Sequence, residues 1–174
     1  MTDQDVPTAE ATEVEEPALI HGAPSSLSRD QLVVHVTPDN YLDIVTALGE
    51  DGYAFCSDVT AVDYLLAIDR PTAIGVTPER FEVVVSLLDM ENGKRIRVRA
   101  QVPEHAPALP TLFGLFPGTE AMEREVYDMF GIVFEGHPDL TRILMPDDWE
   151  GHPLRKDYPI GRIPVQFKEA PGPR

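Results

Sequence analysis

The chain is short of cysteine, and this shortage excludes several kinds of protein. Cys56 is the single cysteine in 174 residues, so an internal disulfide is impossible and an iron–sulfur cluster, which is normally held by several thiolates, has too few ligands. A reducing cytosolic setting is the simplest expectation. The apolar surroundings of Cys56, A-F-C-S-D-V, predict a small side chain buried in a core.

Basic residues are scarce as well. The chain has 14 Lys and Arg against 30 Asp and Glu, a formal net charge of -16. Nucleic-acid binders need a basic footprint for the phosphate backbone, and anionic lipid headgroups also select positive charge. No apolar run approaches the roughly 18 residues that a membrane span requires. We therefore expect no nucleic-acid partner and no membrane-spanning segment.

Signatures of the common enzyme classes are absent from the sequence. It has no G-x-G-x-x-G motif, no P-loop lysine and no G-x-S-x-G elbow. His137 and His152, with three aspartates between them, could supply metal ligands, but their spacing matches no close-spaced zinc pattern and each lies in a Gly-His-Pro turn. We expect these histidines to bond the backbone. A free-standing metal-dependent enzyme remains an alternative, with its cluster completed by Asp139, Asp147 and Asp148.

The N-terminus is acidic. Residues 1–17 contain no base and carry Asp3, Asp5, Glu10, Glu13, Glu15 and Glu16. Such a composition predicts a disordered tail, and it fits neither a secretory signal nor an Arg-rich transit peptide. Residues 18–29 contain proline and serine and are expected to be a linker. Residues 1–30 are thus predicted to be an acidic tail and linker.

Hydrophobic periodicity predicts an α+β domain over residues 31–132. Asn92-Gly93 is a hairpin turn signal between two of the expected strands, and Gly131 is expected to end the second helix. Thr37-Pro38 predicts the start of the first helix, which continues to about Leu48. The fold expected is a small mixed sheet with helices on one side. The remaining elements are a helix over 120–130 and strands at 32–36, 55–66, 81–88 and 95–102.

Bases alternate with apolar residues from Lys94 to Arg99. This period of two predicts a half-exposed strand with a basic outer face. In so acidic a chain a solvated face is favoured first, a docking face for an acidic partner second, and nucleic acid last.

Residues 123–159 combine charge, glycine and proline more densely than a globular core needs. Buried charge is costly and is usually kept for a partner or a site. Arg124 and Asp128 are four residues apart and can pair on the helix, whereas Glu123 and Glu125 point to different faces and are a poor acid/base pair. Local pairing of these helix carboxylates with Arg124 and Arg142 is expected. Residues 133–174 predict a long irregular C-terminal extension that cannot form its own core and is either disordered or packed on another protein.

Three stretches of this segment resemble the 30-kDa subunit family of respiratory complex I, the bacterial form of which is NADH-quinone oxidoreductase. They are E-R-E-V-Y-D-M-F-G-I at 123–132, H-P-D-L-T-R-I-L at 137–144 and E-G-H-P-L-R-K-D-Y-P at 150–159. The resemblance continues more weakly upstream to about Val33. Two positions depart from the family pattern: Thr141 stands where an arginine is common, and Ala121 where a tryptophan is common.

The resemblance implies a non-catalytic structural subunit of the peripheral arm of proton-translocating NADH-quinone oxidoreductase, on the cytoplasmic side of the cell membrane. Such a subunit binds no cofactor itself, while its complex uses FMN, iron–sulfur clusters, NADH and quinone. The implied partners are the 49-kDa quinone-site subunit and neighbouring iron–sulfur subunits. A related quinone-reducing or hydrogenase-like complex with another electron donor is the alternative.

If the resemblance holds, the charged segment forms an interface between subunits. An isolated Trp149 in the loop D-D-W-E-G fits an aromatic anchor on a partner. The residues expected at the interface are Glu123, Arg124, Asp128, His137, Arg142, Trp149, Arg155, Lys156 and Asp157.

Overall fold

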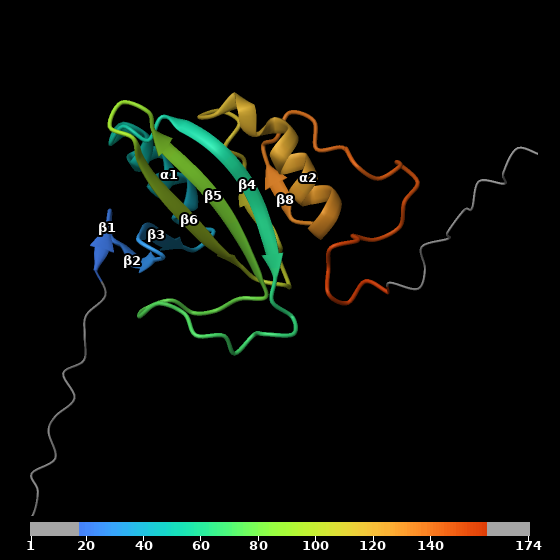
Figure 1. The fold of residues 1–174 in the computed structure, drawn as a ribbon. Coiled ribbons are helices and arrows are strands. Elements are labelled where there is room, and N and C mark those ends of the chain that lie inside the picture. Colours follow the sequence, from blue (N-terminus) through green and yellow to red (C-terminus); the bar gives the residue numbers. More distant parts are fainter. Residues whose placement is uncertain (1–17, 160–174) are drawn as a thin grey trace, which may run out of the picture.

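A computed structural model describes residues 18–159 of the chain (Figure 1). The predicted acidic tail at 1–17 and the final part of the predicted extension, 160–174, lie outside the described residues.

One mixed six-stranded sheet organises the domain, with the strand order β1-β2-β3-β6-β5-β4. β3 and β6 run parallel, and the other neighbouring strands are antiparallel. A second, two-stranded parallel sheet joins β7 (Ala108–Pro110) to β8 (Val133–Glu135). The strands of the large sheet are β1 (Leu19–Ile20), β2 (Ala23–Ser28), β3 (Gln31–Val36), β4 (Phe55–Asp63), β5 (Phe81–Asp89) and β6 (Lys94–Val102).

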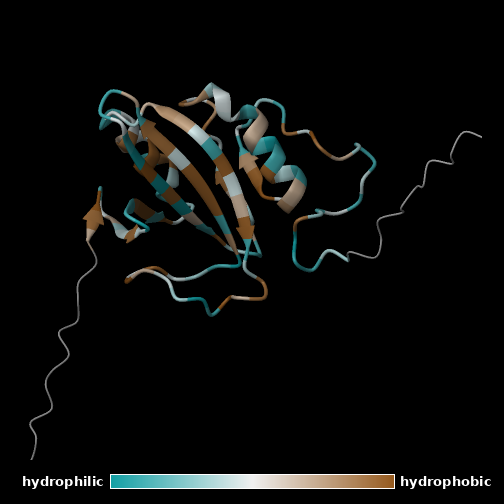
Figure 2. Ribbon diagram, in the orientation of Figure 1, coloured by the Kyte–Doolittle hydropathy of each residue, from teal (hydrophilic) through white to brown (hydrophobic). Residues whose placement is uncertain are grey.

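The helices α1 (Tyr41–Glu50) and α2 (Glu120–Phe130), the second preceded by the short 3₁₀ helix η1 (Pro117–Thr119), share one core with the sheet. Alternate β5 residues from Phe81 to Leu87 are fully buried against apolar residues of both helices. Figure 2 shows the resulting alternation of hydrophobic and hydrophilic residues along the strands. The α+β fold with a mixed sheet and helices on one side is confirmed.

The opposite face of the sheet is polar. It carries Glu82 from β5 and Arg97, Arg99 and Gln101 from β6, which alternate with the core residues. The long connection between β4 and β5, residues 64–80, runs below the sheet in Figure 1. Arg70 of this connection donates to the Gln101 side chain at 2.9 Å, which ties the connection to the polar face.

The predicted linker at 18–29 is wrong, because β1 and β2 occupy most of it. Each is followed by a tight turn, and the turn residues His21, Arg29 and Asp30 have positive φ values of 49, 52 and 62°. Residues other than glycine are uncommon in this conformation. The second turn therefore carries no glycine signal in the sequence, and the hairpin between β2 and β3 was not expected.

The predicted start of the first helix at Thr37-Pro38 is also wrong, since α1 begins at Tyr41. The Oδ1 atom of Asn40 accepts hydrogen bonds from the Thr37 backbone N–H at 2.8 Å and from its hydroxyl at 3.3 Å. This contact closes a turn in front of the helix, so Asn40 and not Thr37 occupies the N-cap position. The helix from 120 to 130 and the hairpin at Asn92-Gly93 are confirmed.

Candidate partner interface

Helix α2 is the base of the charged segment. It ends at Gly131, whose φ of 72° is the left-handed conformation that glycine favours at a helix C-terminus. A Cβ atom here would lie 2.5 Å from Nε2 of His152 and 2.9 Å from an Arg155 guanidinium nitrogen. Glycine is thus needed twice, for its backbone conformation and for the close approach of the chain between 150 and 159.

Asp128 is the buried centre of the contact between α2 and the extension. One oxygen of its fully buried carboxylate accepts backbone N–H groups of Ile143, Leu144 and Met145 at 3.1, 2.8 and 2.8 Å. The other accepts the Arg142 guanidinium at 2.6 Å. Burial raises the pKa of Asp128, but these bonds outweigh burial and leave the pKa below its ordinary value. A charged Asp128 therefore fixes the path of residues 142–145.

The predicted pairing of Asp128 is confirmed with Arg142 and is wrong with Arg124. Arg124 instead donates to the Thr141 carbonyl at 3.1 Å, the Thr141 hydroxyl at 2.9 Å and the Arg142 carbonyl at 2.9 Å. An i, i+4 pair would leave both groups on the helix surface, whereas here each meets the extension. Thr141, a departure from the family pattern, gives Arg124 a hydroxyl acceptor that an arginine side chain at this position would lack.

Residues 152–155 cap the C-terminus of α2, whose last carbonyls have no partner within the helix. A ring nitrogen of His152 lies 2.9 Å from the Asp128 carbonyl oxygen, and the Leu154 backbone N–H donates to the Met129 carbonyl at 3.1 Å. Arg155 donates to the Phe130 carbonyl, and its guanidinium lies 5.1 Å from the Phe81 ring centroid. Positive charge also suits the negative end of the helix dipole.

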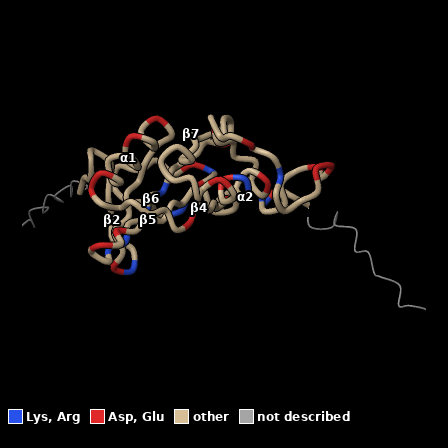
Figure 3. The backbone as a smooth tube through the Cα atoms, turned by 90° about the horizontal axis from the view of Figure 1, so that it is seen from above, with Lys and Arg blue, Asp and Glu red and all other residues tan. Residues whose placement is uncertain are grey.

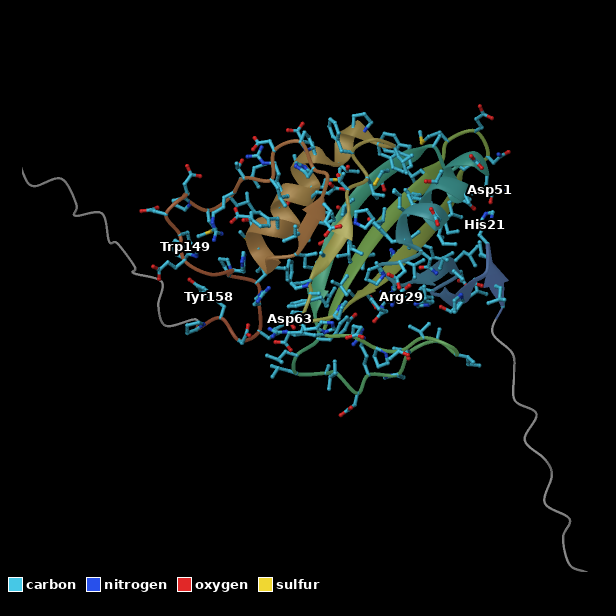
Figure 4. All side chains as sticks on the ribbon, turned by 180° about the vertical axis from the view of Figure 1, so that it is seen from behind. His21, Arg29, Asp51, Asp63, Trp149 and Tyr158 are labelled. Atoms are coloured by element: carbon cyan, nitrogen blue, oxygen red, sulfur yellow. The ribbon has the colours of Figure 1, made fainter. Side chains whose placement is uncertain are left out.

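A second ionic cluster surrounds Arg80, whose side chain is 5% exposed. Its guanidinium bonds both carboxylate oxygens of Asp63 at 2.9 and 3.1 Å, and it pairs with Asp157 at 2.9 Å and with Glu104. The Lys156 backbone N–H donates to Asp63 at 2.8 Å. Figure 4 shows Asp63 at the end of its strand, facing the segment that carries Tyr158. The extension is thereby fastened to the sheet as well as to α2.

The pKa values of Asp63 and Asp157, the two aspartates of this cluster, are both lowered. Burial raises the pKa of Asp63, but hydrogen bonds from Arg80 and from the Lys156 N–H outweigh it and leave the pKa lowered. The Arg80 hydrogen bond also lowers the pKa of Asp157. Sequence reasoning missed Arg80 and Asp63 as partners, because they are neighbours only through the register of β4 and β5, which pairs Asp63 with Phe81.

Glu123 is fully buried on the core side of α2, whereas Glu125 is exposed, as their spacing predicted. The Glu123 carboxylate accepts the Leu112 N–H at 2.7 Å and the Thr111 hydroxyl. Burial raises the pKa of Glu123 above its ordinary value, although these hydrogen bonds oppose the shift. His137 lies 3.9 Å away, with one ring nitrogen 3.1 Å from the Glu120 carbonyl.

Both histidines of the metal alternative contact backbone carbonyls, as expected from their turns. Residues 18–159 contain no group of three or more His, Cys, Asp or Glu side chains placed to bind a metal ion. Cys56 is 8% exposed, which confirms a buried residue, and burial raises the pKa of its thiol to about 11. None of the helices between residues 18 and 159 has the length and apolar character of a membrane span.

Trp149 and Lys156 have groups that the described residues leave without a partner. The Trp149 indole N–H is buried and makes no hydrogen bond within 18–159, and the Lys156 side chain is exposed and forms no ion pair there. An open hollow of about 520 Å³ lies beside them, lined by residues that include Trp149, His152, Arg155 and Tyr158. Within residues 18–159 the extension thus has a charged side bonded to its own domain and a second side that the other described residues do not cover.

Comparisons with known proteins agree with the resemblance in this segment. The family model described as respiratory-chain NADH dehydrogenase, 30 Kd subunit, matches residues 34–163. A subunit of NADH-quinone oxidoreductase from Salinispora arenicola is 44% identical over 147 residues, 83% of this chain and 56% of the relative. The corresponding subunit from Roseiflexus castenholzii is 48% identical, over 82% of this chain and 78% of the relative. The chain thus spans little more than half the length of some relatives.

Two solved structures have the same fold. A trypsin-resistant fragment of Nqo5 is 37% identical, with a TM-score of 0.61, and covers 69% of this chain and 91% of the fragment. A chain of the archaeal membrane-bound sulfane sulfur reductase, a respiratory membrane complex, is 25% identical, with a TM-score of 0.66, over 86% of this chain and 88% of that chain. On its sequence and its fold together, this chain belongs to the family of the 30-kDa subunit of respiratory-chain NADH dehydrogenase.

Proposed function

We propose that the chain is a non-catalytic structural subunit of the peripheral arm of proton-translocating NADH-quinone oxidoreductase. It packs against the 49-kDa quinone-site subunit on the cytoplasmic side of the cell membrane and neighbours iron–sulfur subunits. In this role it binds no FMN, cluster, NADH or quinone itself. The named relatives support the complex, and the open side of the extension supports the packing.

The extension carries the proposal. Its charged groups bond inward to α2 and Asp63, while Ile143, Leu144 and Leu154 turn outward with 41, 60 and 50% of their surface exposed. Single exposed apolar residues are ordinary, but several of them on one short segment rimmed by polar groups are typical of protein–protein contacts. Since two ionic clusters fix the path of the extension before a partner binds, little ordering of its backbone remains to oppose association.

The assignment of residues at the interface follows from this geometry. Arg124, Asp128, Arg142, Arg155 and Asp157 bond within the chain and shape the surface. Among the predicted interface residues, Lys156 has an exposed side chain without an ion pair within residues 18–159, so it is the group best placed to bond a partner. Glu123 and His137, which are buried against each other, support the surface from inside the domain.

Leu144→Glu tests the proposal in the complete complex. A charge at the centre of a desolvated contact costs several kcal/mol, so we expect the tagged variant to recover little of the 49-kDa subunit from gently solubilised membranes. Leu27→Glu is the matched control, because Leu27 is 75% exposed on β2, away from the extension. Mass spectrometry of co-purified subunits and quinone-reductase activity are the measurements. Normal assembly of the Leu144→Glu variant would contradict the proposed packing.

A related complex with another electron donor is the second candidate. The fold similarity to the archaeal sulfane sulfur reductase chain favours it, because that complex is also respiratory and membrane-bound. The same purification separates the two candidates: NADH-binding and FMN-binding subunits recovered with the wild-type chain support the first, and a different donor module supports the second.

A further inference from the structure

The outer face of β6 has a row of arginines in an acidic chain. Arg95, Arg97 and Arg99 alternate with the buried Ile96 and Val98, so all three side chains lie on the polar face of the sheet. Figure 3 marks the basic positions of β6 among predominantly acidic loops. Within residues 18–159 neither Arg95 nor Arg97 forms an ion pair. This face therefore has the character of a docking surface for acidic groups.

Two hollows follow this row along the strand. One, of about 420 Å³, is lined by residues that include Arg95, Arg97, Ser57 and Ser86, and the short serine side chains leave room above the sheet. The other, of about 290 Å³, is lined by Arg99, His35 and others under the 64–80 connection. The two hollows are separate but lie over successive outward-facing residues of β6, first Arg95 and Arg97 and then Arg99 and Gln101, and together they are called the track.

Buried hydrogen-bonding atoms point to the ligand of this track. His35 is 7% exposed; one ring nitrogen lies 2.8 Å from the Ser26 hydroxyl, and the other, Nδ1, has no partner among the described residues. Arg99 Nε is also buried without a hydrogen bond there, although it lies 3.6 Å from a carboxylate oxygen of Glu82. When Ser26 donates its hydroxyl hydrogen to Nε2, both His35 Nδ1 and Arg99 Nε are donors without a hydrogen bond. Unpaired buried donors favour an oxygen acceptor, and a carboxylate is the strongest one in a protein.

The carboxylates of the face supply this acceptor only in part, because the Glu82 oxygen that pairs with Arg99 Nε lies beyond hydrogen-bond distance. Glu82 accepts from Gln101 at 2.6 Å and lies 3.6 Å from both Arg70 and Arg99. Asp30 and Asp58 line the first hollow. The linings of the two hollows contain four arginines, Arg70, Arg95, Arg97 and Arg99, against these three carboxylates. Positive charge therefore remains for an added acidic group.

We propose that this track binds an extended acidic segment, and that the segment is residues 1–17 of the same chain. Those residues contain six carboxylates and no base. The pairs Asp3/Asp5 and Glu13/Glu15 have the same two-residue spacing as the arginines of β6, about 7 Å along an extended chain. Matching spacing allows successive carboxylates to meet successive guanidinium groups, with one carboxylate reaching Arg99 and His35.

The point where residues 1–17 join the domain lies close enough to the track for them to reach it. Ala18 accepts a backbone hydrogen bond from Ser25 of β2 at 2.7 Å, so the segment joins the domain on the sheet itself. β6 lies two strands from β2, which is about 10 Å. Seventeen extended residues span up to about 55 Å, and a short tether raises the local concentration of the segment to about the millimolar range.

Paramagnetic broadening in the full chain tests the proposal. A nitroxide is attached at Ala9→Cys in a Cys56→Ser background. We expect loss of most amide signal at Val33, Ser86 and Arg97 and little loss at Leu48, which lies under the opposite face of the sheet. The broadening should disappear in about 1 M salt, where the screening length is about 3 Å.

Two charge variants complete the test. Replacing Glu13 and Glu15 by Gln leaves the domain untouched and should abolish the localised broadening. Arg97→Glu should do the same, whereas Arg29→Glu, an equal charge change at an exposed turn, should not. Broadening that is weak, uniform or unchanged in the Glu13/Glu15 variant overturns the proposal. Equal binding of a separate acidic peptide with and without residues 2–17 also overturns it, since the face would then be open for a partner.

Discussion

The sheet and the described part of the extension that follows β8, residues 136–159, are stabilised by different means. The sheet buries a continuous apolar cluster that includes Phe81, Val85 and Leu87 from β5. The extension adds few apolar contacts, Leu140 and Met145 among them, and is bonded mainly through buried carboxylates and arginines. Apolar burial is non-directional, whereas charged bonds require each partner in place. The sheet therefore defines the fold, and the extension defines one specific surface on it.

The two regions should also differ in how they fail. Removing an apolar group from the sheet weakens every element that shares the core. Breaking a pair at Asp128 or Arg80 affects a segment that can open locally while the sheet stays folded. Stability and interface shape are thus separable properties of this chain, and three substitutions test that separation.

The largest effect is expected in the sheet, for Leu87→Ala. Leu87 is fully buried near the C-terminal end of β5, so the change leaves a cavity among packed side chains. We expect a loss of roughly 2–5 kcal/mol in the free energy of global unfolding, measured by urea denaturation followed by circular dichroism. Leu66→Ala is the control, since Leu66 is 84% exposed and should change the free energy little. A small effect of Leu87→Ala would contradict a shared core.

Asp128→Asn should act on the extension. The change removes the charge that Arg142 and three backbone N–H groups require and costs roughly 1.5–3 kcal/mol in those bonds. We expect faster hydrogen exchange and proteolysis between residues 137 and 159, with the exchange of β5 and β6 amides almost unchanged. Asp148→Asn, at an exposed position in the same segment, is the matched control. Equal acceleration in β5 would show that the two regions unfold as one.

The elements of the sheet were predictable because their signals are local. Alternation at β5 and β6, the Asn92-Gly93 turn and the 120–130 helix each lie within a dozen or so residues, and the structure confirms them. The failures are also local. Thr37 and Asn40 are both suitable N-cap residues, and the structure uses Asn40. The turn after β2 places Arg29 and Asp30, and no glycine, in the left-handed conformation.

The partners of the charged groups were not predictable, since the fold determines them. Arg80 precedes β5 and Asp63 ends β4, and only strand register joins them to Asp157. The density of charge in residues 123–159 correctly drew attention to the segment. Pairing of the helix carboxylates with both Arg124 and Arg142 was expected, and only the pair of Asp128 with Arg142 forms, because Arg124 donates to backbone and hydroxyl oxygens of the extension. The assignment of these residues to a contact with another subunit stays a prediction.

The smallest effect is expected at Glu123, where the two regions meet. Its carboxylate bonds Thr111 and Leu112 of the domain, and α2 carries it beneath the extension. Because burial raises its pKa in the folded chain above the ordinary value of 4.5, the folded state binds this proton more tightly than the unfolded state. That contribution to stability is fully present below the ordinary pKa and is lost as the pH rises through the raised folded value.

Glu123→Gln removes this titration and keeps an oxygen for the Leu112 N–H. We expect a change of no more than about 1 kcal/mol in unfolding free energy. The difference, variant minus wild type, should become more favourable to the variant between about pH 4 and pH 8. Urea denaturation at both values measures it, with the exposed Glu125→Gln as control. A pH-independent difference would mean that folding does not raise the pKa of Glu123, and a trend of the opposite sign would mean that its carboxylate is stabilised like that of Asp128.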